Sequence, residues 1–296
     1  MRSNGRSLCH FGMTVLIALV ATIGARAQTA SPSPTPDSSP APTLEQGFFK
    51  DILRDQKAIW TAPFHLGRDD TKWLAPVGLG TAALIVTDRQ TGDELAESRG
   101  QLHISRVVSY AGSTLGVAGI TGAFYIVGRS THNYRARETG VLGAEALVDS
   151  GIVVTVVKEI TQRRRPNAAS DRGDFFDGGS SFPSGHSIQA WSLATVIANE
   201  YHDHRAVQIA AYGIAGAVSI SRFTGEKHYL SDVLVGGAMG FGIGRYVYRA
   251  HHRAALSGGD DEEEERLIEH PSRWPAIAPI FGSHGHNYGL GLAWSF

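Results

Sequence analysis

The sequence predicts an all-α fold, a bundle of about six core helices, followed by a short C-terminal β-hairpin. Three observations predict it. Long apolar segments of helix length recur between residues 71 and 250, which is typical of a helical bundle. Small residues are frequent within them, so the helices can approach closely. Near the C-terminus the apolar residues alternate with small ones, which is the period of a strand. The six segments span about 72–87, 103–128, 138–158, 185–203, 205–221 and 229–248.

Composition excludes several classes of protein. The 296 residues carry 27 Lys+Arg against 28 Asp+Glu, a net charge of -1. A general nucleic-acid binder needs an excess of cations, so no nucleic-acid partner is expected. The hydrophobic content of 42% is enough for a core and excludes disorder as the main state. The single cysteine, Cys9, excludes disulfides, Cys-ligated zinc and a Cys nucleophile.

Residues 1–27 are predicted to be a signal peptide. Arg2 and Arg6 precede an apolar stretch over 11–24, and Ala25 to Ala27 form a small-residue cleavage site. We therefore expect an exported protein, periplasmic or associated with an envelope membrane.

Residues 28–43 form a predicted Pro/Ser-rich linker, because five prolines there favour extended conformations. Residues 44–69 are predicted to form an amphipathic helix and a connector. The apolar residues of that helix should pack against the domain, with contact to a membrane surface as the alternative. They are Leu44, Phe48, Phe49, Ile52 and Leu53.

The C-terminal part divides into an acidic linker over 251–268 and a hairpin over 269–296. Alternation from Tyr288 to Phe296 predicts one strand. A turn before Tyr288 would pair this strand with residues 276–281.

Two features of the middle region bear on whether it spans a membrane. Val107 to Gly128 is an uncharged run of spanning length. Glu145 and Asp149 lie one turn apart on the third segment, where acids in lipid would be costly. The acids favour a soluble or peripherally attached bundle, in which they would be polar-face or buried ion-pair residues.

Three short constellations carry the chemistry. From Lys158 to Pro166, one cation ends a helix and further cations follow in a loop. From Ser181 to His186, a Ser and a Gly precede an apolar helix whose free N–H groups can bind an anion. From Ser221 to Asp232, His228 and Asp232 stand four apart, so on a helix the carboxylate could orient the imidazole.

In this order and spacing the constellations resemble the superfamily of type 2 phosphatidic acid phosphatases, bacterial non-specific acid phosphatases and vanadium haloperoxidases. The family pattern is K-x-x-x-x-x-x-R-P, then P-S-G-H, then S-R-x-x-x-x-x-H-x-x-x-D, and every fixed position is filled. The resemblance covers about residues 70–250, which would be the catalytic domain. It implies catalytic residues His228, His186 and Asp232, and phosphate-binding residues Lys158, Arg165, Ser184, Gly185 and Arg222.

The resemblance also implies a mechanism and a substrate class. His228, held by Asp232, would attack phosphorus to give a phosphohistidine, and His186 would protonate the leaving oxygen and then activate water. The substrate would be a phosphomonoester or a lipid phosphate or diphosphate. No metal or other cofactor would be required, and vanadate would act as an inhibitor or as the cofactor of a haloperoxidase.

Alternatives remain open at this point. A vanadate-dependent haloperoxidase and a non-catalytic envelope protein are the competing functions. The histidine pairs could hold metal, but no further ligands stand at a recognisable spacing, so surface histidines and no metal site are predicted. These pairs are His202 with His204, His251 with His252, and His284 with His286. Arg163 and Arg164 are expected to extend the positive field around an anionic substrate without binding the phosphate themselves.

Overall fold

The computed structural model describes residues 47–65, 67–93, 99–168, 172–252, 276–281 and 288–293. Its contacts divide the chain into two units, Met1–His252 and Arg253–Phe296. The predicted signal peptide, the Pro/Ser-rich linker and nearly all of the acidic linker lie outside the described residues. The described part of the first unit is helical, which confirms the predicted fold class.

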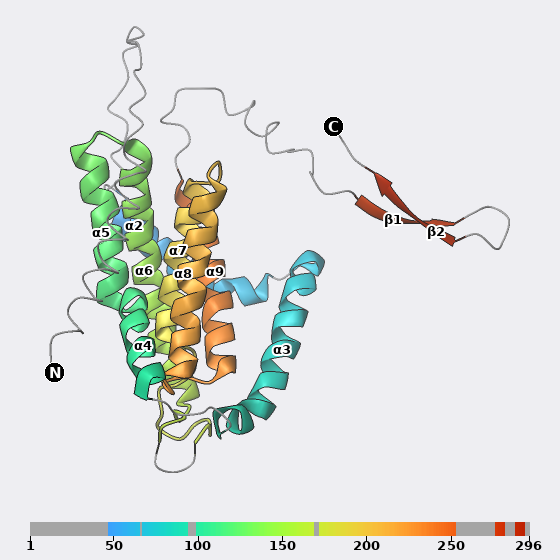
Figure 1. Ribbon diagram of the computed structural model, residues 1–296. Coiled ribbons are helices and arrows are strands. Elements are labelled where there is room, and N and C mark those ends of the chain that lie inside the picture. The colour runs from blue at the N-terminus through green and yellow to red at the C-terminus, as the bar shows by residue number, and fades with distance from the viewer. Residues whose placement is uncertain are drawn as a thin grey trace, which may run out of the picture. The chain divides into compact units, whose positions relative to one another are not determined.

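Eight α-helices and two 3₁₀ turns build the described part of the first unit (Figure 1). In chain order they are α2 (Phe48–Thr61), η1 (Ala62–Phe64), α3 (Arg68–Asp93), α4 (Arg99–Ser109), η2 (Tyr110–Gly112), α5 (Thr114–Ser130), α6 (Tyr134–Thr161), α7 (Gly185–Glu200), α8 (Arg205–Thr224) and α9 (Leu230–His251).

Helix α7 is the centre of the bundle, because it packs against α6, α8 and α9. Helix α5 packs on α6, α4 on α8, and α3 on α9 (Figure 1). The main core lies where α6, α7 and α9 meet. Its buried side chains are Leu142, Ala146, Val153, Val154, Ile188, Val196, Ile243 and Val247.

Glycines on one face of α9 allow α7 to approach closely. A Cβ on Gly240 or Gly244 would lie 2.3 Å from a carbonyl oxygen of α7, and a Cβ on Gly236 would lie 2.7 Å from the carbonyl oxygen of Ser184. A side chain at any of these positions would force the helices apart. Gly242, on another face of the same helix, has nothing within 4 Å of its Cβ position among the described residues.

The prediction of one continuous helix over 103–128 is wrong. The segment is broken at η2, and α4 and α5 are bent by 46° at the break. Gly112 sits so close to α8 that a Cβ there would lie 2.1 Å from the Val218 side chain. Ser113 then starts α5 as its N-cap, since its side chain accepts a hydrogen bond from the Gly116 N–H at 3.0 Å.

Helix α2 docks through polar side chains rather than through its whole predicted apolar face. Phe49 and Leu53 are 81% and 74% exposed, whereas Ile52 is buried. Beside Ile52, the fully buried Asp55 accepts from His251 Nε2 on α9, with both carboxylate oxygens at 2.8 Å. The prediction that His251 is a surface histidine is therefore wrong.

The two acids on α6 are buried on this α2-facing side. Glu145 is 1% exposed and Asp149 is fully buried. Gln56 of α2 donates its side-chain N–H to Asp149 at 2.8 Å. Both acids are therefore buried rather than on a polar face, and the partner of Asp149 is an amide rather than the cation of the predicted ion pair.

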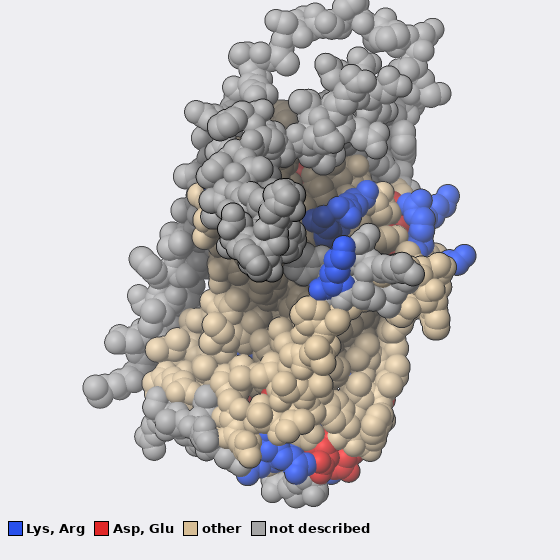
Figure 2. Space-filling view, turned by 90° about the vertical axis from the view of Figure 1, so that its right-hand side faces the viewer, with Lys and Arg blue, Asp and Glu red and all other residues tan. Residues whose placement is uncertain are grey.

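Two helices, α6 and α8, are long and apolar enough to cross a membrane, and the bent pair of α4 and α5 would make three. Figure 2 shows one face on which the visible charged side chains gather towards two ends, with a broad band of other residues between them. Large apolar side chains are exposed on several helices, including Leu79 at 73%, Val86 at 81% and Ile209 at 72%. An uncharged surface of this kind is typical of contact with lipid or a partner.

The second unit contains the predicted pair of strands. β1 (Ala276–Phe281) and β2 (Tyr288–Ala293) pair antiparallel, with Ala276 opposite Ala293 and Phe281 opposite Tyr288.

Candidate active site

The three constellations converge at one end of the bundle. The C-terminus of α6, the N-termini of α7 and α9 and the C-terminus of α8 all lie there, because α7 and α9 run antiparallel to α6 and α8 and pack against them (Figure 1). The long segment between α6 and α7 covers this end. Residues 70 positions apart in the sequence therefore meet at one site.

The segment after α6 is fixed to the helix by backbone hydrogen bonds. Lys158 lies in the last turn of α6, and the helix stops at Gln162, which adopts the left-handed conformation with φ of 43°. The Gln162 carbonyl accepts from the Gly179 N–H at 2.8 Å, and the Arg163 carbonyl accepts from the Ser181 N–H at 2.8 Å. These bonds bring Ser181, at the start of the second constellation, back to the end of α6.

Helix α7 begins as the sequence predicts. Ser184 is its N-cap, and its side chain accepts from the Ser187 N–H at 3.5 Å. The Ser184 N–H itself donates to the Asp232 carbonyl at 3.0 Å, which ties α7 to the first turn of α9. A Cβ on Gly185 would lie 3.8 Å from Lys158 Nζ, so the ammonium reaches the open N-terminus of α7.

His228 precedes α9, which corrects the prediction that it shares a helical face with Asp232. It is 2% exposed, and its Nδ1 lies 2.7 Å from the Ser181 carbonyl oxygen. A carbonyl can only accept, so Nδ1 carries the proton and Nε2 keeps its lone pair. The Asp232 carboxylate lies 3.6 Å from the same Nδ1, so it acts on the ring mainly as a nearby negative charge.

Asp232 caps the start of α9. Its Oδ2 accepts from the Tyr229 N–H at 2.9 Å and from the Ser181 hydroxyl. Its Oδ1 accepts from Arg163 at 2.6 Å. Burial alone would raise the pKa of Asp232, but the His228 and Arg163 side chains outweigh it and hold the pKa below its usual value.

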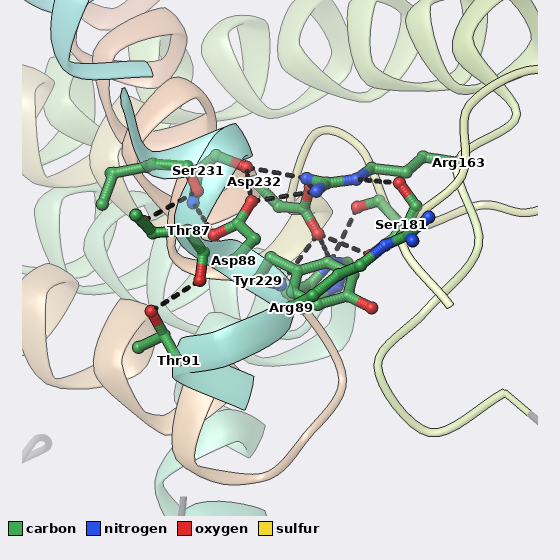
Figure 3. A network of polar contacts seen from close by, with 12 residues as sticks. Thr87, Asp88, Arg89, Thr91, Arg163, Ser181, Tyr229, Ser231 and Asp232 are labelled. Atoms are coloured by element: carbon green, nitrogen blue, oxygen red, sulfur yellow. Dashed lines mark hydrogen bonds and ion pairs between the residues drawn. The ribbon is translucent and has the colours of Figure 1, made fainter. Parts of the chain in front are cut away.

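Arg163 is the hub of this network, contrary to the prediction that it only widens the outer field (Figure 3). It is 1% exposed and donates to Asp232 and, at 2.9 Å, to Asp88 on α3. It also donates to the Ser231 hydroxyl at 2.7 Å. Its guanidinium lies over the Tyr229 ring, 4.4 Å from the centroid. Arg163 therefore joins α3 and α9 at the point where Asp232 faces His228.

Arg164 is a different case. It pairs with Asp177 in the loop, and both side chains are more than a third exposed. The two neighbouring arginines therefore divide into a buried hub and a surface ion pair.

The site is strongly positive. Burial and the nearby charge of Arg222 lower the pKa of His186 to about 3, and His228, Lys158 and Arg165 act in the same direction. Burial lowers the pKa of His228 to about 4, against the opposing effect of Asp232. Both imidazoles are therefore neutral near neutral pH when no anion is bound.

Arg222 lies beside His186 in the lining of a cavity and has a donor without a partner in the described part of the chain. Its Nε is buried and has no hydrogen-bond partner among the described residues. A buried guanidinium N–H without a partner is costly unless a ligand satisfies it. Arg165, by contrast, donates to Ser180 at 3.3 Å.

A cavity of about 310 Å³ opens beside His186 and Arg222. Helix α4, which lies outside the three constellations, supplies one wall of it. Its polar lining consists of Ser105, Arg106, Ser109, Tyr110, Ser113, Asn167, Ser221, Glu226 and Lys227.

Comparison with known families gives the same assignment as the three constellations. Residues 139–255 match the model of the PAP2 superfamily. The match covers less than half of the chain. The matched region begins within α6 and runs just past α9, so it includes all of the catalytic positions predicted from the sequence.

Two phosphatases are similar to this chain. Over 69 residues it is 38% identical to the lipid A 1-phosphatase of Porphyromonas gingivalis, which is 23% of this chain and 16% of that protein. The chain thus matches only about a sixth of the length of this relative. A crystal structure described as the first transmembrane PAP2 type phosphatidylglycerolphosphate phosphatase, from Bacillus subtilis, aligns with a TM-score of 0.46 and 24% identity, over 70% of this chain and 96% of that one.

Sequence reasoning missed the residues that support this candidate site. Asp88 stands 75 residues before Arg163 and outside the matched region, and no local spacing relates the two. Ser181 was recognised as part of its constellation, but not as the acceptor that sets the tautomer of His228. The one sequence signal that Arg163 belongs to the site is its place two residues before Arg165, which was predicted to bind phosphate.

Proposed function

We propose that the protein is a metal-independent phosphatase that hydrolyses a phosphomonoester or a lipid phosphate or diphosphate through a phosphohistidine on His228. The observation that carries the proposal is the hydrogen bond from His228 Nδ1 to the Ser181 carbonyl, 2.7 Å long. It fixes the proton on Nδ1 and leaves Nε2 as a lone-pair nucleophile in a cationic site. The PAP2 superfamily match supports the same reaction class.

In the first step His228 Nε2 attacks phosphorus, and an N–P bond forms as the P–O bond to the leaving group breaks. The ring gains positive charge, which the Asp232 carboxylate at 3.6 Å stabilises. His186 donates its proton to the leaving oxygen. In the second step neutral His186 takes a proton from water, the water oxygen attacks phosphorus, and the N–P bond breaks; the phosphate then leaves with the proton from His186, which is neutral again.

The proton on His186 must arrive with the substrate. In the empty site its pKa is about 3, because burial and the surrounding cations disfavour imidazolium. A bound phosphate neutralises those cations and raises the pKa of His186. We therefore infer that the substrate binds as its monoanion and passes its proton to His186, which then delivers it to the leaving oxygen.

The phosphoryl oxygens would be held by an anion clamp, defined as Lys158, Arg165, Arg222, the Ser184 side chain and the Gly185 N–H. The unpartnered Arg222 Nε and the closeness of Lys158 Nζ to Gly185 support this assignment. Phosphoryl transfer needs mainly such positioning and charge stabilisation.

The leaving group would occupy the cavity beside His186. Its volume is about 310 Å³, and its lining carries hydroxyl groups and charged side chains beside apolar surface, which fits a sugar or a polar head group. Arg106 and Lys227 at its wall would favour a second anionic group on the substrate. The name of the lipid A 1-phosphatase relative supports a lipid phosphate, and the exposed apolar side chains support membrane association.

The test is phosphate release by the purified full chain in EDTA, with an aryl phosphate and a lipid phosphate in parallel. We expect release to survive EDTA, to disappear in His228→Gln and to be inhibited by vanadate. The Arg164→Gln variant serves as a control, because Arg164 is in a surface pair outside the clamp. Failure to release phosphate from either ester, with vanadate-dependent halide oxidation in its place, would instead make the protein a haloperoxidase.

A further inference from the structure

A second cluster of titratable side chains lies at the opposite end of the bundle from His228. Glu138 is in the second turn of α6, Glu200 is the last residue of α7, and His252 follows α9. Helix α7 has 16 residues and begins next to Ser184, so Glu200 is about 24 Å from the phosphate clamp at 1.5 Å per residue. The cluster therefore belongs to a separate site.

The three side chains converge on one point. His252 Nδ1 lies 3.3 Å from Glu138 Oε1 and 3.4 Å from Glu200 Oε1. All three ligand atoms are within 4.8 Å of one another. Both glutamate side chains are only 2% exposed, while His252 is 29% exposed and gives the cluster a contact with solvent.

The contacts are longer than ordinary charge-assisted hydrogen bonds. Glu200 Oε1 and His252 Nδ1 are both buried atoms that have no hydrogen-bond partner among the described residues. Both atoms are therefore available to an ion that lies between them. Two ligand atoms bound to a tetrahedral ion at about 2.05 Å lie about 3.3 Å apart. The observed 3.3 and 3.4 Å are the edges of such a tetrahedron.

We propose that Glu138, Glu200 and His252 bind a divalent transition-metal ion, for which Zn²⁺ has the best-matching geometry. Two carboxylates and one imidazole are a common ligand set for such ions, and water would take the fourth position. A nearby cation, Arg135, forms a hydrogen bond with Asp203 at 2.9 Å and acts on Glu200 only through its charge.

The ion would have a structural role. Its ligands come from α6, α7 and the end of α9, which are the three helices that form the main core. Binding would join the ends of these helices that lie opposite His228, as Arg163 joins α3 and α9 at the catalytic end. Sequence spacing predicted no metal site because the two glutamates lie 114 and 52 residues before His252.

The test uses the full chain without an affinity tag. Protein is loaded with Zn²⁺, desalted and analysed for metal, and its thermal unfolding is measured with and without Zn²⁺. We expect about one equivalent per chain in the wild type. At free Zn²⁺ about a hundredfold above the dissociation constant, the unfolding midpoint should rise by about 5–10 °C. Co²⁺ in place of Zn²⁺ should give the visible absorption of a tetrahedral ion.

Glu200→Gln and His252→Gln should each lose the bound equivalent and the shift in midpoint. Their matched controls are Glu159→Gln and His202→Gln, which change exposed residues of the same types and should keep both. Since His252 is at the solvent margin, His252→Gln tests the site even if Glu200→Gln fails to fold. Equal Zn²⁺ in the wild type and the two site variants would overturn the proposal. So would a wild type that retains no Zn²⁺, in which case His252 is a protonated bridge between the glutamates.

Discussion

Replacing Arg163 by Met should strongly destabilise the protein. Arg163 and its partners Asp88 and Asp232 are each at most 2% exposed. The substitution keeps an unbranched apolar side chain but removes the only cation that contacts either carboxylate among the described residues. Breaking a buried ion pair costs about 3–5 kcal/mol, because an uncompensated charge stays buried. Asp88 and Asp232 keep other hydrogen bonds, so we expect a value within this range rather than twice as large.

The adjacent residue provides the matched control. Arg164→Met removes the same charge from a pair that is more than a third exposed, where the cost is at most about 1 kcal/mol. The assay is urea unfolding followed by circular dichroism for both variants. A double variant, Arg163→Met with Asp88→Asn, should be more stable than the sum of the single effects predicts, because it removes one stranded charge. If Arg163→Met is no more destabilising than Arg164→Met, the role assigned to the buried network is refuted.

Three further predictions concern the chemistry and the packing beneath it. His186→Gln should lower kcat/KM, which reports the steps up to the phosphohistidine, roughly 10²–10⁴-fold for an alkyl phosphate and less for an aryl phosphate whose leaving group needs no proton; an equal loss of kcat/KM for both would exclude His186 as the acid. The value of kcat/KM should fall below about pH 4, where His228 gains a proton and loses its nucleophilic lone pair. It should also fall above about pH 6, where the substrate monoanion loses its proton, so a pH–rate profile that is flat from 6 to 8 would contradict the proton delivery. Gly240→Ala should lower the free energy of unfolding by about 1–3 kcal/mol, because its Cβ meets α7. Gly242→Ala should raise the free energy of unfolding by about 0.5–1 kcal/mol, because Ala is more favourable than Gly inside a helix. Similar effects of the two substitutions would contradict the close packing of α7 and α9.

Local sequence patterns predicted the helices, because the apolar face and the cap of a helix are formed by residues close together in the sequence. Apolar periodicity gave the six core segments, and Ser184 marked the start of α7 through a cap that acts over three residues. The same reasoning missed the break at η2, because the cause is the approach of Val218 to Gly112 from more than 100 residues away. A pattern of uncharged residues cannot show such a contact.

The candidate site likewise has one part that local spacing predicts and another that depends on tertiary structure. The fixed spacings within the three constellations predicted which residues meet, and the structure brings Lys158, His186 and His228 to one end of the bundle. The buried partners of those residues depend on tertiary structure. Asp88 reaches Arg163 from α3, and Ser181 reaches His228 from a loop. His228 itself lies before α9, because Tyr229 is the N-cap of this helix and its N–H is bound by the Asp232 side chain.

The most direct test of the central claim is to trap the phosphoryl group on the enzyme. The protein is mixed rapidly with an aryl phosphate in EDTA, quenched in base, digested, and analysed by mass spectrometry under basic conditions. His186→Gln should accumulate the intermediate, because the aryl leaving group departs unaided while water is no longer activated. The account predicts phosphate on His228 in the wild type, more of it in His186→Gln and none in His228→Gln. Phosphate on another residue, or continued turnover by His228→Gln, would contradict it.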